Sequence, residues 1–315
     1  MENKKFSPIS IKQASWLFSL GILLIIVSFF LPLQTGKNST LMEQFVYLNA
    51  VEFALVTVVI AAFAFSLKNR ELPIRLNPIK VRNIPLLVIY AWSLIPISLF
   101  LSMATSNIAT NAVEASSESL ASPPAWITII SAAIIAPLVE EFMFRGILYE
   151  SFSYKKESKL ISVLLVSFLF GLLHMNLNQF LYATFVGFFL CLAVEATDSI
   201  WGGVITHAAF NFTEILVFLS SSTETTSSTA EVVSEVTDSS MGVDIAFFVV
   251  VVVAIAFFLG IAFLILNVML KINGTQKSFN TMFKPSLDFK NALQYTPILL
   301  GASLCVMIIL LEFLL

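Results

Sequence analysis

The chain has 315 residues, of which 58% are hydrophobic and only 12% are charged, and its mean hydropathy is +0.92. Soluble domains carry roughly 25% charged residues, so this composition excludes a water-soluble globular protein and also the disordered and fibrous classes. A porin-like barrel, which alternates polar and apolar residues, does not fit 30 Phe with 11 Gly, and the net charge of −3 without a long basic run gives nucleic-acid binding no support.

The apolar residues fall into nine stretches that could each cross a membrane, which requires about 20 residues per helix. We therefore predict an all-α, polytopic membrane protein with about nine transmembrane helices. The first stretch is interpreted as a retained helix, because no small-residue cleavage site follows it. The predicted spans are 14–33, 45–66, 84–103, 126–150, 160–175, 179–195, 200–219, 243–270 and 294–315.

The basic residues predict the orientation of these spans. If the N-terminus is cytoplasmic, every Lys and Arg lies in an inner segment except Lys37, in an outer loop, and Arg145, within a span. The positive-inside rule therefore predicts a cytoplasmic N-terminus and an external C-terminus. Cys191 and Cys305 both lie in apolar stretches and indicate neither a disulfide nor a cysteine metal cluster.

Ionisable residues within spans cost about 2.5–3.5 kcal/mol each to insert, so each is a functional-site hypothesis. The fourth span, PLVEEFMFRGILYE, contains Glu140, Glu141 and Arg145. The fifth ends in FGLLH with His174, and the seventh contains THAAFN, with one histidine and one asparagine four residues apart. The two histidines of the chain thus both lie in apolar segments.

Helical spacing separates the roles of these residues. Glu141 and Arg145 are four residues apart and share a helix face, so we expect an ion pair that acts as a structural clamp. Glu140 points about 100° away and gains no partner at that spacing, which suits a general base. His207 and Asn211 share a face and should look into one interior space.

Chain lengths predict the depth of the same residues. Glu140 and His174 are each 17 residues from a turn near Glu157, so in an antiparallel hairpin both lie roughly 25 Å above it. His207 and Asn211 lie somewhat nearer the inner side, and helix tilt could bring all four together.

Simpler interpretations remain open for single residues. A membrane histidine often serves only as a helix–helix hydrogen bond. Glu195 with Asp198 is interpreted as marking a short inner turn. Glu214, three residues after Asn211, could face the same interior space but is not assigned a role.

Three segments together resemble the signatures of a known family. EEFMFRG (Glu140–Gly146), FGLLH (Phe170–His174) and HAAFN (His207–Asn211) are similar, in order and spacing, to the EExxxR, FxxxH and HxxxN/D motifs of the CAAX-protease and bacteriocin-processing family (CPBP, also called Abi) of intramembrane proteases. The resemblance covers roughly 126–219 and implies a four-helix catalytic core there. Residues 1–125 then hold three further spans, and 220–315 hold a low-complexity outer loop with two more.

The resemblance also implies roles for the site residues. Glu140 and His174 would activate a water, and His207 and Asn211 would stabilise the oxyanion. Two neighbouring residues would support them, namely Glu141 and Arg145.

The family has been called a metalloprotease, so a zinc ion is a further possibility. Glu140, His174 and His207 could ligate one Zn²⁺. The sequence lacks HExxH and a thiolate cluster, and we slightly prefer a metal-free glutamate mechanism with no certain cofactor.

The resemblance predicts an endopeptidase in a bacterial plasma membrane, with the lipid bilayer as its surroundings. Its partner would be a membrane-associated peptide or protein, prenylated or of the pheromone or bacteriocin type. Two other functions remain open. One is a bacteriocin-immunity or peptide-binding protein without catalysis, and the other is a proton-coupled secondary transporter, in which buried Glu and His form a relay.

Overall fold

The computed structural model describes residues 9–30, 40–66, 74–106, 108–109, 123–154, 159–223, 241–283 and 292–314. These residues form helices and turns and contain no strand, which confirms the predicted all-α membrane fold. The turn near Glu157 and the acidic segment 224–240 lie outside the described residues. The helices are α1 (Ile11–Phe29), α2 (Leu41–Leu48), α3 (Ala50–Ser66), α4 (Asn83–Thr105), α7 (Ala125–Ile130), η1 (Ser131–Ile135), α8 (Ala136–Glu141), η2 (Phe142–Tyr149), α9 (Glu150–Ser153), α10 (Leu160–Leu173), α11 (Leu177–Thr197), α12 (Ile200–Thr223), α14 (Met241–Asn273), α15 (Gln276–Met282), η3 (Ala292–Tyr295) and α16 (Thr296–Leu314).

The number of full membrane spans differs from the expected nine. Among the described residues, seven helical segments are long and apolar enough to cross a membrane. The predicted second span is a bent pair, α2 and α3, with a 60° angle between its halves. The predicted fifth span forms α10, whose 14 residues fall short of the roughly 20 that a hydrocarbon core requires. The described chain therefore has seven straight spans, or eight if the bent pair is one.

Asn49 explains the bend between α2 and α3. Its side-chain amide donates to the Phe45 carbonyl and to Ser131 Oγ, both at 2.8 Å. The first bond adds a second donor to the Phe45 carbonyl, which also accepts the backbone N–H of Asn49, and the second connects the break to η1. A polar side chain that is inserted at the junction and bonded to both α2 and η1 is a local cause of the change in helix direction.

The predicted fourth span is one continuous helical rod with two π-helical stretches. It runs from α7 through η1, α8 and η2 to α9, and Glu140 and Glu141 lie in the short α-helical part between the two π segments. A π-helix shifts the hydrogen bonds from i+4 to i+5 and often occurs at functional sites. The regular 100° advance per residue therefore does not hold along the whole rod.

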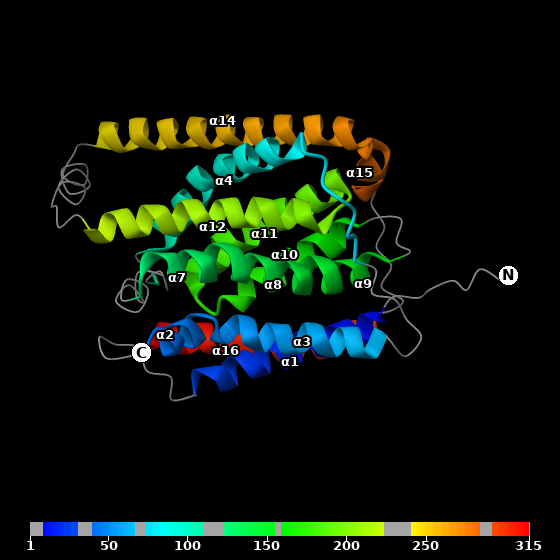
Figure 1. Cartoon of the computed structure of the whole chain (residues 1–315). Coiled ribbons are helices and arrows are strands. Elements are labelled where there is room, and N and C mark those ends of the chain that lie inside the picture. Colours follow the sequence, from blue (N-terminus) through cyan, green and yellow to red (C-terminus); the bar gives the residue numbers. More distant parts are fainter. Residues whose placement is uncertain are drawn as a thin grey trace.

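The helices that carry the predicted site lie in the centre of the bundle. In Figure 1, α4 and α14 lie on one side of the α8, α10, α11 and α12 group, and α1, α3 and α16 lie on the other. Helix α10 packs against α11, and α4 packs against α11, α12 and α14. Helix α1 packs against α3 and α16. The central helices are thus enclosed on both sides by segments distant in the sequence.

An ion-pair cluster fastens the segment before α4 to one end of the central helices. Arg75 Nη2 lies 2.6 Å from Glu195 Oε1, and Arg75 Nε lies 2.6 Å from Glu150 Oε1. Glu195 also accepts hydrogen bonds from Tyr149 Oη at 2.8 Å and Lys159 Nζ at 3.1 Å. The interpretation of Glu195 as a turn marker was therefore incomplete, because its carboxylate is the buried centre of this cluster.

Asp198 does mark the expected turn between α11 and α12. It has a left-handed backbone, with φ at 51°, at the C-cap of α11. Aspartate tolerates this conformation better than most residues. Its side chain accepts a hydrogen bond from Asn77 Nδ2 at 3.0 Å, so the turn is also tied to the segment before α4.

Candidate active site

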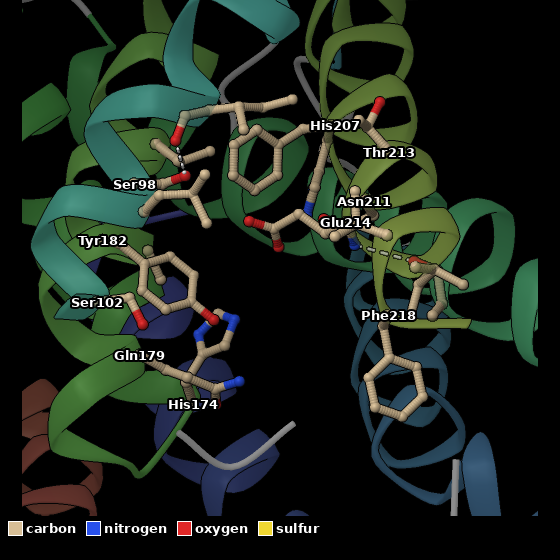
Figure 2. Close-up of a pocket in the computed structure, with 18 of the residues that line it drawn as sticks. Ser98, Ser102, His174, Gln179, Tyr182, His207, Asn211, Thr213, Glu214 and Phe218 are labelled. Carbon is tan, nitrogen blue, oxygen red and sulfur yellow. Dashed lines mark hydrogen bonds between the residues drawn. The ribbon is translucent and has the colours of Figure 1, made fainter. Parts of the chain in front are cut away.

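The four predicted catalytic residues line one cavity. Glu140 reaches it from α8, His174 from the end of α10, and His207 and Asn211 from α12, and the cavity has a volume of about 480 Å³. Figure 2 shows His207 and Asn211 on one wall and Tyr182 and Gln179 across from them. The remaining lining residues are Ile95, Ser98, Leu99, Ser102, Ala132, Phe170, Gln179, Tyr182, Ala183, Val186, Phe210, Thr213, Glu214, Ile215, Val217 and Phe218.

Glu141 and Arg145 form the ion pair that their spacing predicts. Arg145 Nη1 donates to Glu141 Oε1 at 2.6 Å, and both side chains have an exposed fraction of 0%. Arg145 Nη2 donates to the Gly187 carbonyl on α11 at 2.8 Å, and the guanidinium lies 4.5 Å from the centre of the Phe170 ring. One buried cation thereby connects the α8–η2 rod to α10 and α11.

His207 extends this pair, which the spacing did not predict. Its Nδ1 lies 3.1 Å from Glu141 Oε1, the same oxygen that Arg145 contacts. A carboxylate paired with arginine only accepts hydrogen bonds, so we assign the Nδ1 hydrogen to this contact. The ring is thus fixed in orientation, with Nε2 free for the cavity.

Glu140 is less isolated than we expected. Its Oε2 lies 3.8 Å from His207 Nε2, whereas the sequence interpretation left it without a partner and placed it with His174. The His207 ring thus lies between the two carboxylates, with Nδ1 3.1 Å from Glu141 Oε1 and Nε2 3.8 Å from Glu140 Oε2.

His174 is held at the C-cap of α10. Its Nδ1 lies 3.0 Å from the Phe170 carbonyl, and a carbonyl can only accept, so Nδ1 carries the hydrogen in this contact. The Nε2 of neutral His174 then has a free lone pair. The Phe170 ring packs edge-on between the two histidines, at 5.2 Å from His174 and 5.6 Å from His207 between ring centres.

Asn211 uses half of its donor capacity within the protein. Its Nδ2 donates to the Ala132 carbonyl at 2.9 Å, the bond that Figure 2 marks on the right of the cavity. Ala132 belongs to η1. The amide nitrogen has two hydrogens, so this bond fixes Asn211 and leaves one N–H for a bound group.

The close packing of Gly203 against Glu141 gives a testable requirement of this geometry. A Cβ at Gly203 would lie 2.4 Å from Glu141 Oε2, whereas one at Gly260 on α14 would meet nothing within 4 Å. We expect Gly203→Ala to destabilise the protein by about 1–3 kcal/mol, because Glu141 must move away from Arg145. Gly260→Ala, the matched control, should be neutral or stabilising by up to about 1 kcal/mol.

The measurement is the unfolding transition of both variants in the same detergent. A Gly203→Ala protein as stable as the Gly260→Ala protein would contradict the tight seating of Glu141.

The predicted zinc ligands do not form a recognisable metal site. Among the described residues, no group of three or more His, Cys, Asp or Glu side chains is arranged to hold a metal ion. Glu140, His174 and His207 line the same cavity but do not make such a group. The mechanism below therefore contains no metal step, and zinc dependence stays a prediction.

Sequence reasoning missed part of the cavity wall. Glu214 lines it, which agrees with the expectation that it could face the same interior space as Asn211, although no role was assigned to it. The polar residues of α4, Ser98 and Ser102, also line the cavity. Helix α4 contains no Asp, Glu, Lys, Arg or His, so the search for charged residues within spans could not find it.

Comparisons with known proteins support the resemblance for the central region. Residues 122–213 match the family model described as type II CAAX prenyl endopeptidase Rce1-like. A Bacillus subtilis (strain 168) protein, YdiL, whose name describes it as a candidate membrane peptidase, is 31% identical over 85 residues. That alignment covers 27% of this chain and 34% of YdiL, so the matched region spans about a third of its relative. No solved structure matches the chain significantly. The family resemblance that three motifs predicted is thus confirmed for residues 122–213.

Proposed function

We propose that this protein is an intramembrane endopeptidase that hydrolyses a peptide bond of a membrane-associated peptide. The observation that carries the proposal is the meeting of Glu140, His174, His207 and Asn211 at one cavity among apolar helices. Buried ionisable groups in a membrane protein are costly and are retained mainly for function. The match of residues 122–213 to a family of membrane endopeptidases supports the same reaction.

The first step is activation of a water by Glu140 and His174. The Glu140 carboxylate takes one proton from the water as the water oxygen attacks the peptide carbonyl carbon. The free Nε2 of His174 accepts a hydrogen bond from the other O–H of the water and orients it, so that this hydrogen stays on the attacking oxygen. The C–N bond then breaks, and protonated Glu140 gives its proton to the departing amine.

The second requirement is a set of hydrogen-bond donors for the peptide carbonyl oxygen, which becomes negatively charged during the attack. Asn211 supplies its remaining N–H, and the protonated form of His207 supplies Nε2–H. The Nδ1 contact with Glu141 holds the His207 ring and stabilises its positive charge. Donors fixed before the reaction stabilise the transition state without reorganisation.

The substrate class that fits is a prenylated, pheromone-type or bacteriocin-type peptide. The cavity opens among helices whose outer surfaces are apolar, and its own walls combine apolar groups such as Ile95, Leu99 and Phe218 with a few polar ones. A peptide that partitions into the membrane reaches such a site with little desolvation cost.

Asn211→Ala is the variant that tests the oxyanion role. Losing one oxyanion donor typically lowers turnover about 100- to 1000-fold, so we expect a reduced but measurable rate. Asn267→Ala on α14, a matched control whose side-chain amide donates to the Phe263 carbonyl of its own helix, should cleave normally. The assay is cleavage of prenylated and unmodified peptides by purified protein, followed by mass spectrometry.

The same assay with a chelator tests the metal-free mechanism. We expect unchanged turnover after chelation. Loss of activity that zinc restores would keep the peptidase but replace the proposed water activation. Absence of any cleavage, together with peptide binding or proton-coupled uptake in vesicles, would favour the immunity or transporter function instead.

A further inference from the structure

Glu214 is a carboxylate of the cavity wall that the proposed mechanism does not use. It lies on α12 beside His207 and Asn211, across the cavity from Ser102 and Tyr182 (Figure 2). Its carboxylate has no hydrogen bond or ion pair with the residues that the structure describes. A carboxylate left without a partner in an apolar protein is costly, so its presence at this wall requires a reason.

The charge of the cavity supplies that reason. Glu141 is paired with Arg145, and Glu140 lies 3.8 Å from His207, whereas no cationic side chain contacts Glu214 among the described residues. None of the described residues that line the cavity is a Lys or Arg, so an ionised Glu214 is balanced only by a cation of the bound molecule.

The position of Glu214 sets which part of a peptide it would meet. It follows His207 by seven residues on one helix, a rise of about 10 Å. An extended peptide advances about 3.3 Å per residue. If the cleaved carbonyl lies near His207, Glu214 lies beside a side chain within about three residues of the cleaved bond.

We propose that Glu214 is a specificity residue that selects peptides with a basic side chain near the cleaved bond. This inference rests on the proposed function, because it concerns the same cavity. Glu214 directly follows the matched segment 122–213, so the family match does not account for it. The Lys or Arg head group forms an ion pair with the Glu214 carboxylate, and its stem lies along the apolar wall.

The test uses internally quenched peptides, blocked at both ends, with an alanine–leucine background. Lys, norleucine or Glu is placed in turn at each of the three positions on either side of the centre. Norleucine keeps the alkyl stem of lysine without its charge. At one or more positions we expect the wild type to prefer Lys over norleucine by about tenfold or more in kcat/KM, and to disfavour Glu.

Glu214→Gln should abolish this preference by lowering kcat/KM for the Lys peptides to that of the norleucine peptides. Glu43→Gln, which removes an equal charge from the exposed start of α2, should keep the preference. Equal cleavage of Lys and norleucine peptides by the wild type would overturn the proposal. So would an equal preference in Glu214→Gln.

A binding measurement separates this proposal from the proposed function. In a His174→Ala background, affinity for the Lys and norleucine peptides is compared with and without Glu214→Gln. If the wild type cleaves none of the peptides but Lys peptides bind more tightly in a Glu214-dependent way, the peptidase function fails and the basic-group site stands. If the Lys and norleucine peptides bind with equal affinity both with and without Glu214→Gln, the proposed binding site for a basic group is wrong.

Discussion

Replacing Glu140 or His174 by alanine is expected to abolish peptide cleavage while the protein still inserts and folds. Glu140 takes a proton from the attacking water and His174 accepts a hydrogen bond from it, and groups in such positions contribute about 100- to 10,000-fold each. Both side chains line the cavity, and neither belongs to the buried Glu141–Arg145 ion pair, so their loss leaves that pair intact. The measurement is single-turnover cleavage at high enzyme concentration, with size-exclusion profiles as the folding check.

The control is Glu43→Ala, which removes a carboxylate from an exposed position and should cleave at the wild-type rate. Full activity in Glu140→Ala would refute the activation of water by Glu140, whereas absence of cleavage by the wild type would place the transporter and peptide-binding functions first. A small, equal loss in all variants would point to a folding effect and would also refute the assigned roles.

Glu141→Gln should destabilise the protein far more than Glu140→Gln. Glu140 and Glu141 are adjacent and receive the same substitution, so a difference in stability between the two variants reflects the different surroundings of the two side chains. Glu141 contacts both Arg145 and His207 and is fully buried, whereas Glu140 lies 3.8 Å from its nearest cationic partner. Removing one member of a buried ion pair costs about 3–5 kcal/mol, because the other charge is left uncompensated.

Denaturant unfolding in detergent and the yield of monodisperse protein are the measurements. The double variant Glu141→Gln with Arg145→Gln should recover part of the loss, because it removes the uncompensated cation. If Glu141→Gln and Arg145→Ala both unfold and cleave like the wild type, the clamp has no energetic role.

The fold class and much of the candidate site follow from local sequence patterns. Hydropathy alone predicted the helical membrane architecture, since a hydrocarbon environment leaves the backbone few alternatives. The i,i+4 spacing of Glu141 and Arg145 predicted their ion pair, because both lie on one helix. The expected common interior space for His207 and Asn211 agrees with the cavity that both line.

The features that the sequence did not predict all depend on contacts between distant segments. The Asn49 bend requires Ser131, 82 residues away, and the burial of Glu195 requires Arg75, 120 residues away. The contact of His207 with Glu141 likewise joins separate helices. A helical wheel describes the faces of a single helix and not the contacts between helices. The two π segments also change the angular advance per residue on which a helical wheel depends.

The contribution of α4 to the cavity limits how modular the catalytic core can be. Ile95, Ser98, Leu99 and Ser102 form part of its wall, yet they lie outside the matched segment 122–213. A chimera that transplants only that segment into a relative would acquire a foreign wall opposite His207. A chimera that receives α4 together with residues 122–213 takes both walls of the cavity from one parent. We therefore expect substrate preference to be transferred only when α4 and residues 122–213 are exchanged together.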